Sequence, residues 1–433
     1  MPHRTALSVT LGAFLAALTP GTFAAPALDY TFGVLLEHSD NINLSDNDPI
    51  SGNILAPRLA FSLDEQGATL TANAAGSLEY RDYFGAPFGN ELRTLLSGSA
   101  DWHISPGRFD WVFADNIGRQ PVNALQSDAP SNQQQTNLFT TGPTLRAKFS
   151  DVLRGQFDLR YTNSRADTTS DFNSNRYGAV GSLLYQLDPT DTLSGSVTAG
   201  RTRYIEAASR QFDYDREDAY VGYQRDMHDF TFNAAVGYSF LDIRNLDSRS
   251  GSLLRASLHW NPTPATSLGV NLGHEYSDAA QDLVFTPNQL ANVGIGSGLN
   301  GAVVTPQVYV GTRVSLDFSH REDRFRVAIA PFWRKLNYID TTVSDQHSTG
   351  YYASAEYSLR PTLWFGFFVG QERRSYTSID RTDDDLGTGV SLNLQRTPHW
   401  LYSLSAAHTR RNSDGVNSSY TENSLMLTVT WRR

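Results

Sequence analysis

The chain has 433 residues, a formal net charge of −10 and no cysteine. The absence of cysteine excludes disulfides, thiolate metal sites and cysteine nucleophiles. The acidic balance argues against a nucleic-acid-binding protein. Aromatic residues make up 12 % of the chain and charged residues 18 %, a balance that favours β-structure.

The N-terminus has the features of a secretory signal peptide. A short polar start at His3 and Arg4 precedes an apolar run from Ala6 to Leu18, and the small residues Thr22 and Ala24 follow. They occupy the −3 and −1 positions of a cleavage site, so residues 1–24 are predicted to be removed. The alternative is a buried N-terminal helix, because the run is too short to span a bilayer.

From residue 28 to the end, apolar and polar residues alternate over stretches of about ten positions. Between 70 and 81, for example, Leu70, Leu78 and Tyr80 share one face, and Thr71 and Asn73 share the other. Similar stretches occur at 230–240, 254–260, 308–319 and 386–395. This period of two is typical of strands with one apolar and one polar face. No later stretch reaches the ~20 apolar residues of a membrane-spanning helix.

Two kinds of connection alternate along the chain. Short turns occur at 64–67, 105–107, 150–154, 188–191, 226–229, 261–264, 321–323, 360–362 and 397–399, and longer polar connections at 44–53, 123–135, 168–174, 281–305, 341–348 and 414–419. Outer-membrane barrels have this arrangement, with short periplasmic turns and long outward-facing loops. We therefore predict that residues 25–433 form one all-β domain, a transmembrane antiparallel up-and-down β-barrel of about 20 strands (about 18 to 20).

Charged side chains on the polar face distinguish this barrel from a soluble β-sandwich. A water-filled lumen accepts such groups, whereas a packed core does not. Both signs of charge occur, so no preference for anions or cations follows, and a structural network in the inner wall is the alternative role. The predicted pore-lining residues are Glu79, Arg81, Asp101, Asp158, Arg160, Arg255, Glu275, Arg313, Asp317, Arg326, Arg334 and Glu356.

No motif indicates catalysis or cofactor binding. The chain lacks a Gly-x-Ser-x-Gly elbow, a His-Glu-x-x-His helix motif and a phosphate-binding glycine loop. We therefore predict that the protein is not an enzyme and assign no catalytic residue, cofactor or metal ligand. The acidic run Asp383–Asp385 is expected at the tip of an outer loop. Solvation there, or bridging to lipopolysaccharide through divalent ions, is favoured over a calcium site.

Two further segments bear on assembly and conduction. The alternating stretch 425–431 resembles the C-terminal signature that the outer-membrane assembly machinery recognises, although Arg432 and Arg433 follow the aromatic Trp431. The connection 281–305 is too long for a plain turn and mixes apolar residues with glycine. The sequence does not decide between two alternatives for this connection, an inward fold that narrows the pore and a loop outside the lumen.

The start of the predicted mature chain resembles a known family. Asp40-Asn41-Ile42, the Asp- and Ser-rich stretch after it, and Pro57 are similar to the first hairpin of outer-membrane β-barrel porins encoded near exopolysaccharide and exosortase loci. The likeness in sequence ends shortly after Pro57, and the likeness in architecture extends over the whole mature chain. The resemblance implies an outer-membrane barrel that serves polysaccharide export and carries no catalytic residues.

These features predict a porin-like channel in the outer membrane of a Gram-negative bacterium, for export or diffusion of polysaccharide or other polar solutes. A non-conducting scaffold barrel of an envelope assembly is the main alternative, and a filled lumen would favour it. An outer-membrane enzyme is the third, and a Ser-His-acid or paired-carboxylate cluster at the outer rim would favour it. Expected partners are outer-membrane lipid and lipopolysaccharide, the barrel assembly machinery, and polysaccharide or periplasmic export components, with no nucleic acid.

Overall fold

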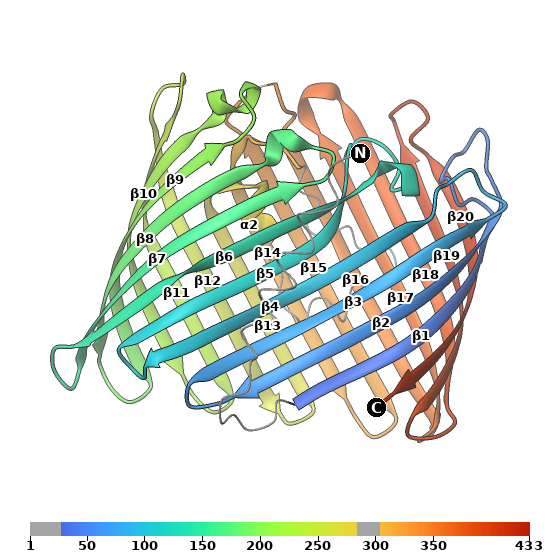
Figure 1. Cartoon of the computed structure of the whole chain (residues 1–433), viewed down its shortest axis with the longest axis horizontal. Coiled ribbons are helices and arrows are strands. Elements are labelled where there is room, and N and C mark those ends of the chain that lie inside the picture. The colour runs from blue at the N-terminus through green and yellow to red at the C-terminus, as the bar shows by residue number, and fades with distance from the viewer. Residues whose placement is uncertain (1–26, 284–303, 341) are drawn as a thin grey trace.

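The computed structural model describes residues 27–283, 304–340 and 342–433, in which twenty strands form one closed antiparallel sheet. Strands that follow one another in the chain pair side by side, and β20 (Tyr420–Arg432) pairs with β1 (Ala27–Ser39) to close the ring. Figure 1 shows β1, in blue, beside β20, in red. The predicted up-and-down barrel is confirmed. The predicted signal peptide and positions 284–303 lie outside the described residues.

The strands are 13 to 16 residues long, enough to cross a bilayer at a tilt. After β1 they are β2 (Gly52–Gln66), β3 (Leu70–Phe84), β4 (Glu91–Ser105), β5 (Phe109–Pro121), β6 (Gln133–Lys148), β7 (Leu153–Ala166), β8 (Ser174–Gln186), β9 (Asp191–Tyr204), β10 (Tyr214–Asp226), β11 (Phe230–Ile243), β12 (Arg249–Thr263), β13 (Thr266–Asp278), β14 (Val308–Arg321), β15 (Phe325–Tyr338), β16 (Gln346–Arg360), β17 (Leu363–Tyr376), β18 (Arg381–Gln395), β19 (Trp400–Ser413) and β20.

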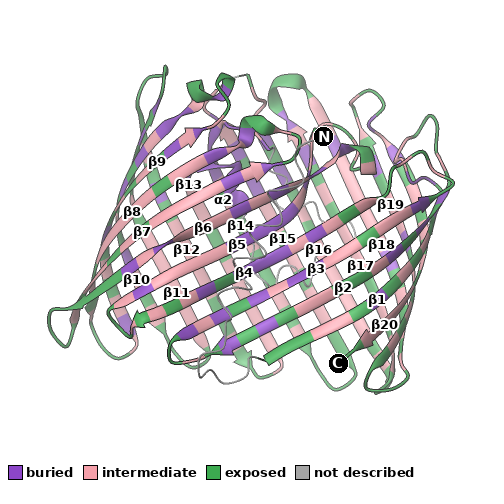
Figure 2. Ribbon diagram, in the orientation of Figure 1, coloured by how far each residue is buried: buried purple, intermediate pink, exposed green. Residues whose placement is uncertain are grey.

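The period of two places apolar side chains on the outside of the barrel. On β1, Leu28, Phe32 and Leu36 are each 51 % exposed, and exposed residues are spread over the whole wall (Figure 2). Leaving so much apolar surface in water would be costly, whereas hydrocarbon accepts it. Within the described residues, no helix has the length and apolar character needed to cross a membrane.

Tryptophan pairs lie on the outer face beside the short turns. Trp102 is the cross-strand partner of Trp111, and Trp400 is the partner of Trp431. Aromatic residues at such positions form the girdles that mark the edge of a membrane-spanning apolar band.

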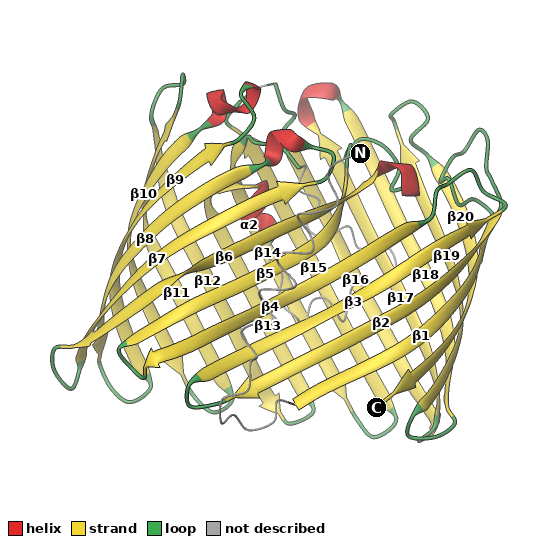
Figure 3. Ribbon diagram, in the orientation of Figure 1, coloured by secondary structure: helices red, strands yellow, loops and turns green. Residues whose placement is uncertain are grey.

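Short and long connections lie at opposite ends of the barrel. The short turns join each even-numbered strand to the next strand, and both Ala27 and Arg432 lie at their end. The long connections include four segments that the sequence analysis did not mark, 85–90, 205–213, 244–248 and 377–380. Short helical turns lie at this end (Figure 3).

The expectation of an acidic loop tip at Asp383–Asp385 is wrong. These residues lie within β18, in register with Arg374 to Glu372 of β17 and with Ser413 to Arg411 of β19. The Asp383 carboxylate accepts hydrogen bonds from Arg381 and Ser413. Cross-strand partners of opposite charge therefore extend the strand through a sequence that looked like a polar loop.

Gly142 in β6 provides a test of backbone packing in the wall. Its φ of 156° is unfavourable for residues with a side chain, and a Cβ there would collide with the carbonyl oxygen of Leu159. We expect Gly142→Ala to lower the free energy of unfolding by about 1–3 kcal/mol, measured by urea titration in detergent micelles. The control Gly195→Ala adds a Cβ with no atom within 4 Å and should change stability by less than about 0.5 kcal/mol. Equal stability of the two variants would contradict the close approach at Gly142.

Candidate functional site

The structure places all the predicted pore-lining residues on the inner face of the wall. Glu79, for instance, shares its face with its partners Arg58 and Arg93, whereas the next residue, Tyr80, points outward and is 45 % exposed. Whether these residues contact a permeating solute stays a prediction. Their inward position gives the interior of the barrel its polar character.

Most of these residues are joined in ion pairs. The sequence analysis missed two partners, Asp282 for Arg313 and Glu372 for Arg334. Asp101 and Asp317 take part in none of the ion pairs found among the described residues. The pairs within the predicted set are Glu79–Arg81 at 2.6 Å, Asp158–Arg160 at 3.0 Å, Arg255–Glu275 at 2.5 Å and Arg326–Glu356 at 3.1 Å. The pairs between strands, such as Arg255–Glu275 and Arg326–Glu356, cross-link the wall.

The lumen is narrower at the end with the long connections. Along the inner face of β14, Tyr309 is fully buried, Arg313 is partly buried, and Asp317 and Ser319 are exposed. Exposure therefore rises steadily toward the short-turn end. Side chains at the long-connection end must be covered by something inside the barrel, and two inward-folded segments supply that cover.

The first segment is the connection between β5 and β6, residues 122–132, here called the first arm. The β4–β5 ladder stops at Leu96 and Ile117, although β5 continues to Pro121. The arm then reaches inward-facing residues of β17 and β19, which are not neighbours of β5 in the ring. Tyr376 Oη donates to the carbonyl of Ala124 at 3.4 Å, and Arg411 Nη1 donates to that of Gln126 at 2.9 Å. The first arm thus crosses the lumen.

Asn132 holds the first arm in shape. Its side-chain amide donates to the carbonyls of Asn123 and Ser127 at 2.8 and 2.9 Å, and its side-chain oxygen accepts from the backbone N–H of Asn123 at 2.9 Å. Asn132 is 6 % exposed, so these bonds are shielded from water. A compact loop braced by its own buried side chain is suited to a fixed position in the lumen.

The second arm comprises residues 278–283 and 304–307, the described ends of the β13–β14 connection. The β12–β13 ladder stops at Leu254 and His274, four residues before β13 ends at Asp278. The buried Asp278 carboxylate accepts from Arg176 of β8 at 2.5 Å and from Tyr214 of β10. It also accepts from the backbone N–H of Gln281 at 3.1 Å. These contacts reach strands that are not neighbours of β13 in the ring.

Apolar contacts complete the docking of the second arm. The short helix α2 (Ala279–Asp282) lies within the ring of strands (Figure 3). Ala279, Ala280, Leu283 and Val304 form a buried cluster with Leu138, Ala166 and Phe172. Of the two alternatives for the 281–305 connection, its described ends therefore favour the inward fold.

The residues that carry the family resemblance lie where the ring closes. Asp40 accepts hydrogen bonds from the backbone and side-chain N–H groups of Asn423, both at 2.7 Å, and Asn41 donates to the carbonyl of Thr421 at 2.8 Å. Burial raises the pKa of Asp40, but the hydrogen bonds from Asn423 outweigh burial, and the pKa lies below its ordinary value. Ile42 packs with Ile54 on the inner side. The motif therefore ties the first long connection to β20.

One inner cluster has the order hydroxyl, imidazole, carboxylate. His103 Nε2 lies 3.0 Å from Thr71 Oγ1, and its Nδ1 lies 2.9 Å from Asp110. The strands that carry these residues are paired with one another, so their N–H groups are used in ladder bonds and are not free to stabilise an oxyanion. Asp110 also binds Arg146. Among the described residues, no group of three His, Asp or Glu side chains could hold a metal ion.

No protein-family model and no curated protein matches the chain. Solved structures similar to it include the FrpB iron transporter from Neisseria meningitidis, F3-3 variant, with a TM-score of 0.44 and 9 % identity over 93 % of this chain and 81 % of that one. Pseudomonas aeruginosa OccK2 (OpdF) in complex with glucuronate matches with a TM-score of 0.40 and 9 % identity over 95 % and 100 % of the chains. A BenF-like porin from Pseudomonas fluorescens Pf-5 matches with a TM-score of 0.39 and 8 % identity over 95 % and 100 %. This distant likeness is one of architecture and says nothing of cargo.

The buried pair between Arg176 and Asp278 should hold the second arm in place. Arg176→Met would leave the fully buried Asp278 carboxylate without its cation, a change that costs about 3–5 kcal/mol for a buried pair. We expect hydrogen exchange of the backbone in Ala279–Leu283 to become faster. Arg201→Gln breaks an ion pair whose arginine side chain is 61 % exposed, so it should leave exchange unchanged. Unaltered exchange in Arg176→Met would show that the apolar cluster alone holds the arm.

Proposed function

We propose that this protein is an outer-membrane channel for polar solutes, with a lumen that two arms narrow at one end. The observation that carries the proposal is the contrast between the two faces of the wall. Apolar side chains such as Val197 and Val236, each 62 % exposed, cover the outside, whereas the inner face is polar and becomes exposed toward the short turns. Such a closed sheet leaves no strand edge in hydrocarbon. The short turns would face the periplasm, as in other outer-membrane barrels.

Aromatic rings on the inner wall support a sugar chain as the cargo. Phe332, Tyr352 and Phe368 occupy three successive strands, β15, β16 and β17, and each lies against a glycine of the next strand. These glycines are Gly350, Gly370 and Gly389, the respective cross-strand partners of the three rings. Because glycine has no side chain, each ring lies along the wall and keeps its other face toward the lumen.

The three rings form a slanting path. Ala330 is the partner of Tyr352, so Tyr352 lies two positions closer to the short turns than Phe332 does. Phe368 lies a further two positions closer, because Gly370 is the partner of Tyr352. All three rings are partly exposed. Successive aromatic faces beside polar groups such as Glu356 suit a chain of sugar rings, which offer apolar faces and hydroxyl edges. This agrees with the polysaccharide cargo that the family resemblance implies.

The arms also favour a second candidate function. The first arm is held by side chains of the opposite wall, and the second is docked through a buried ion pair, so a scaffold barrel that does not conduct would have the same features. Conductance distinguishes the two functions.

The first arm should limit the conductance of a single barrel in a planar bilayer. We expect the full-length protein to form stable channels, and deletion of residues 124–129 to raise the conductance about twofold or more, because it removes every carbonyl that binds the opposite wall. The matched control deletes residues 245–247 of the exposed β11–β12 connection and should leave conductance unchanged. If neither the intact protein nor the 124–129 deletion conducted, the channel proposal would be overturned and the scaffold function favoured.

The aromatic path should determine block by sugars. We expect oligosaccharides of increasing length to block the current with rising affinity, and Phe332→Ala and Tyr352→Ala each to weaken block about five- to tenfold, the loss of roughly 1 kcal/mol of ring contact. Phe367→Ala removes an outward-facing ring that is 48 % exposed and serves as the control. Block that is independent of chain length, or unaffected by the inner variants, would contradict a sugar cargo while leaving a channel for other polar solutes intact.

A further inference from the structure

The outer face of β17–β20 changes from apolar to charged within a few residues of the long connections. One cross-strand row consists of Phe367, Val390, Ala406 and Leu425. Two rows nearer the long connections, the corresponding row consists of Gln371, Leu386, Arg410 and Thr421. The next row contains Arg373, Asp384 and Asn412. The end of the apolar band therefore coincides with the appearance of two arginines.

No carboxylate of a described residue forms an ion pair with either of these two arginines. Arg410 donates through Nε to the side-chain oxygen of Asn412 at 2.9 Å, and its terminal nitrogens have no hydrogen-bond partner among the described residues. Within the described part of the chain neither Arg373 nor Arg410 has an ion pair, although Asp384 is the cross-strand partner of Arg373. By contrast, Arg201 and Arg203 on the outer face of β9 both pair with Asp215, at 2.8 and 2.9 Å.

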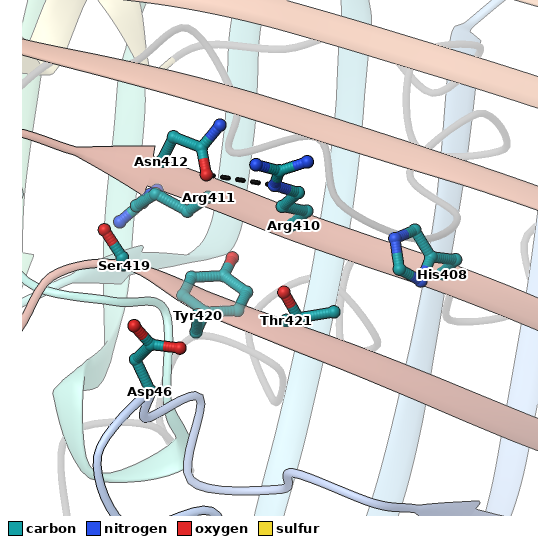
Figure 4. A pocket seen from close by; sticks show the side chains of 8 residues that line it. All are labelled: Asp46, His408, Arg410, Arg411, Asn412, Ser419, Tyr420 and Thr421. Atoms are coloured by element: carbon teal, nitrogen blue, oxygen red, sulfur yellow. Dashed lines mark hydrogen bonds between the residues drawn. The ribbon is translucent and has the colours of Figure 1, made fainter.

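Both arginines line hollows in this face. A hollow of ≈ 280 Å³ is bounded by Gln371, Arg373, Asp384, Asp385, Leu386, Arg410 and Asn412. A neighbouring hollow of ≈ 340 Å³ shares Arg410 and adds His408 and Thr421. Figure 4 shows Arg410 and His408 on one strand, Thr421 on the next, and Asp46 of the β1–β2 connection at the far side. Arg410 thus stands between two adjoining hollows.

We propose that this face binds the phosphorylated sugar headgroup of an outer-leaflet glycolipid. Guanidinium groups bind phosphate oxygens through paired N–H donors, which assigns the phosphates to Arg373 and Arg410. The side chains of Gln371, Asn412 and Asp384 are suited to sugar hydroxyls. Two rows nearer the short turns, Phe367, Val390 and Leu425 are 48, 54 and 53 % exposed and would contact the acyl chains. This continuity of charged hollow and apolar surface favours a lipid over a free anion.

The site is independent of conduction, because the side chains assigned to the headgroup and the acyl chains face away from the lumen. The test uses the full-length protein in mild detergent and three probes: diphosphorylated lipid A, monophosphorylated lipid A and inorganic phosphate. Native mass spectrometry measures the retained lipid. We expect diphosphorylated lipid A to bind more tightly than the monophosphorylated form, and millimolar inorganic phosphate not to displace it.

The decisive variant is Arg373→Gln with Arg410→Gln, which should weaken binding of diphosphorylated lipid A about tenfold or more. The matched control, Arg201→Gln with Arg203→Gln, removes two outer arginines that already have a carboxylate partner and should bind as the wild type does. Arg373→Lys with Arg410→Lys keeps the charges but removes the paired N–H donors, so it should weaken binding about threefold or more, although less than the glutamine variant does, and it carries the test if the glutamine variant does not fold.

Three results would overturn the proposal. Equal binding by the glutamine variant and the wild type would show that the arginines do not contact the headgroup. Equal binding of the two lipid A forms would show that phosphate is not recognised. Displacement by inorganic phosphate would indicate a site for free anions. Conductance of the glutamine variant should equal that of the wild type. The lipid-binding measurement does not depend on conduction, so it still tests this proposal if the protein forms no channel.

Discussion

The closure of the sheet is the constraint on which the rest of the structure depends. In hydrocarbon an unpaired strand edge would leave a row of N–H and C=O groups without partners, so the first and last strands must pair. β1 and β20 do so over nine residue pairs from Thr31–Arg432 to Ser39–Ser424. Asp40 and Asn41 prolong this seam beyond the strands by bonding Asn423 and Thr421. The residues that resemble a family motif therefore act where the barrel would otherwise open.

Each arm begins where two neighbouring strands stop pairing, a local exception to the pairing that closes the sheet. Where β5 leaves β4, the carbonyl of Thr94 loses its ladder partner and accepts instead from the side chain of Gln135 at 3.1 Å. Where β13 leaves β12, Arg216 donates to the carbonyl of Tyr276, and Tyr204 Oη donates to that of Pro306 at 2.6 Å. Side chains of neighbouring or more distant strands thus supply hydrogen-bond partners for carbonyls that the ladders leave unpaired. Buried backbone groups need such partners, so these side chains stabilise the inward folds.

The sequence predicted the barrel because its signals are local. A period of two and an alternation of short and long connections can be counted along the chain, and side-chain parity places Glu79 and Arg255 on the inner face without knowledge of any contact. The arms have no such signal. The bond from Tyr376 to Ala124 spans 252 positions and that from Arg411 to Gln126 spans 285. The strand at Asp383–Asp385 lacks a local signal too. Asp385 is stabilised by Arg411 of the next strand, and Asp383 by Arg381, two positions earlier on the same strand.

The distribution of arginine partners separates structural from ligand-binding charges. An ion removed from water needs a partner, because the desolvation of an unpaired charge is severe, and the buried inner arginines Arg176, Arg334 and Arg374 each have a carboxylate. Arg373 and Arg410 are the immediate chain neighbours of Arg374 and Arg411, and therefore lie on the opposite face of the same strands. There the side chains remain hydrated at the edge of the apolar band and need no internal partner. One pair of adjacent positions on a strand therefore supplies both a cross-link of the wall and a cation that an external phosphate can bind.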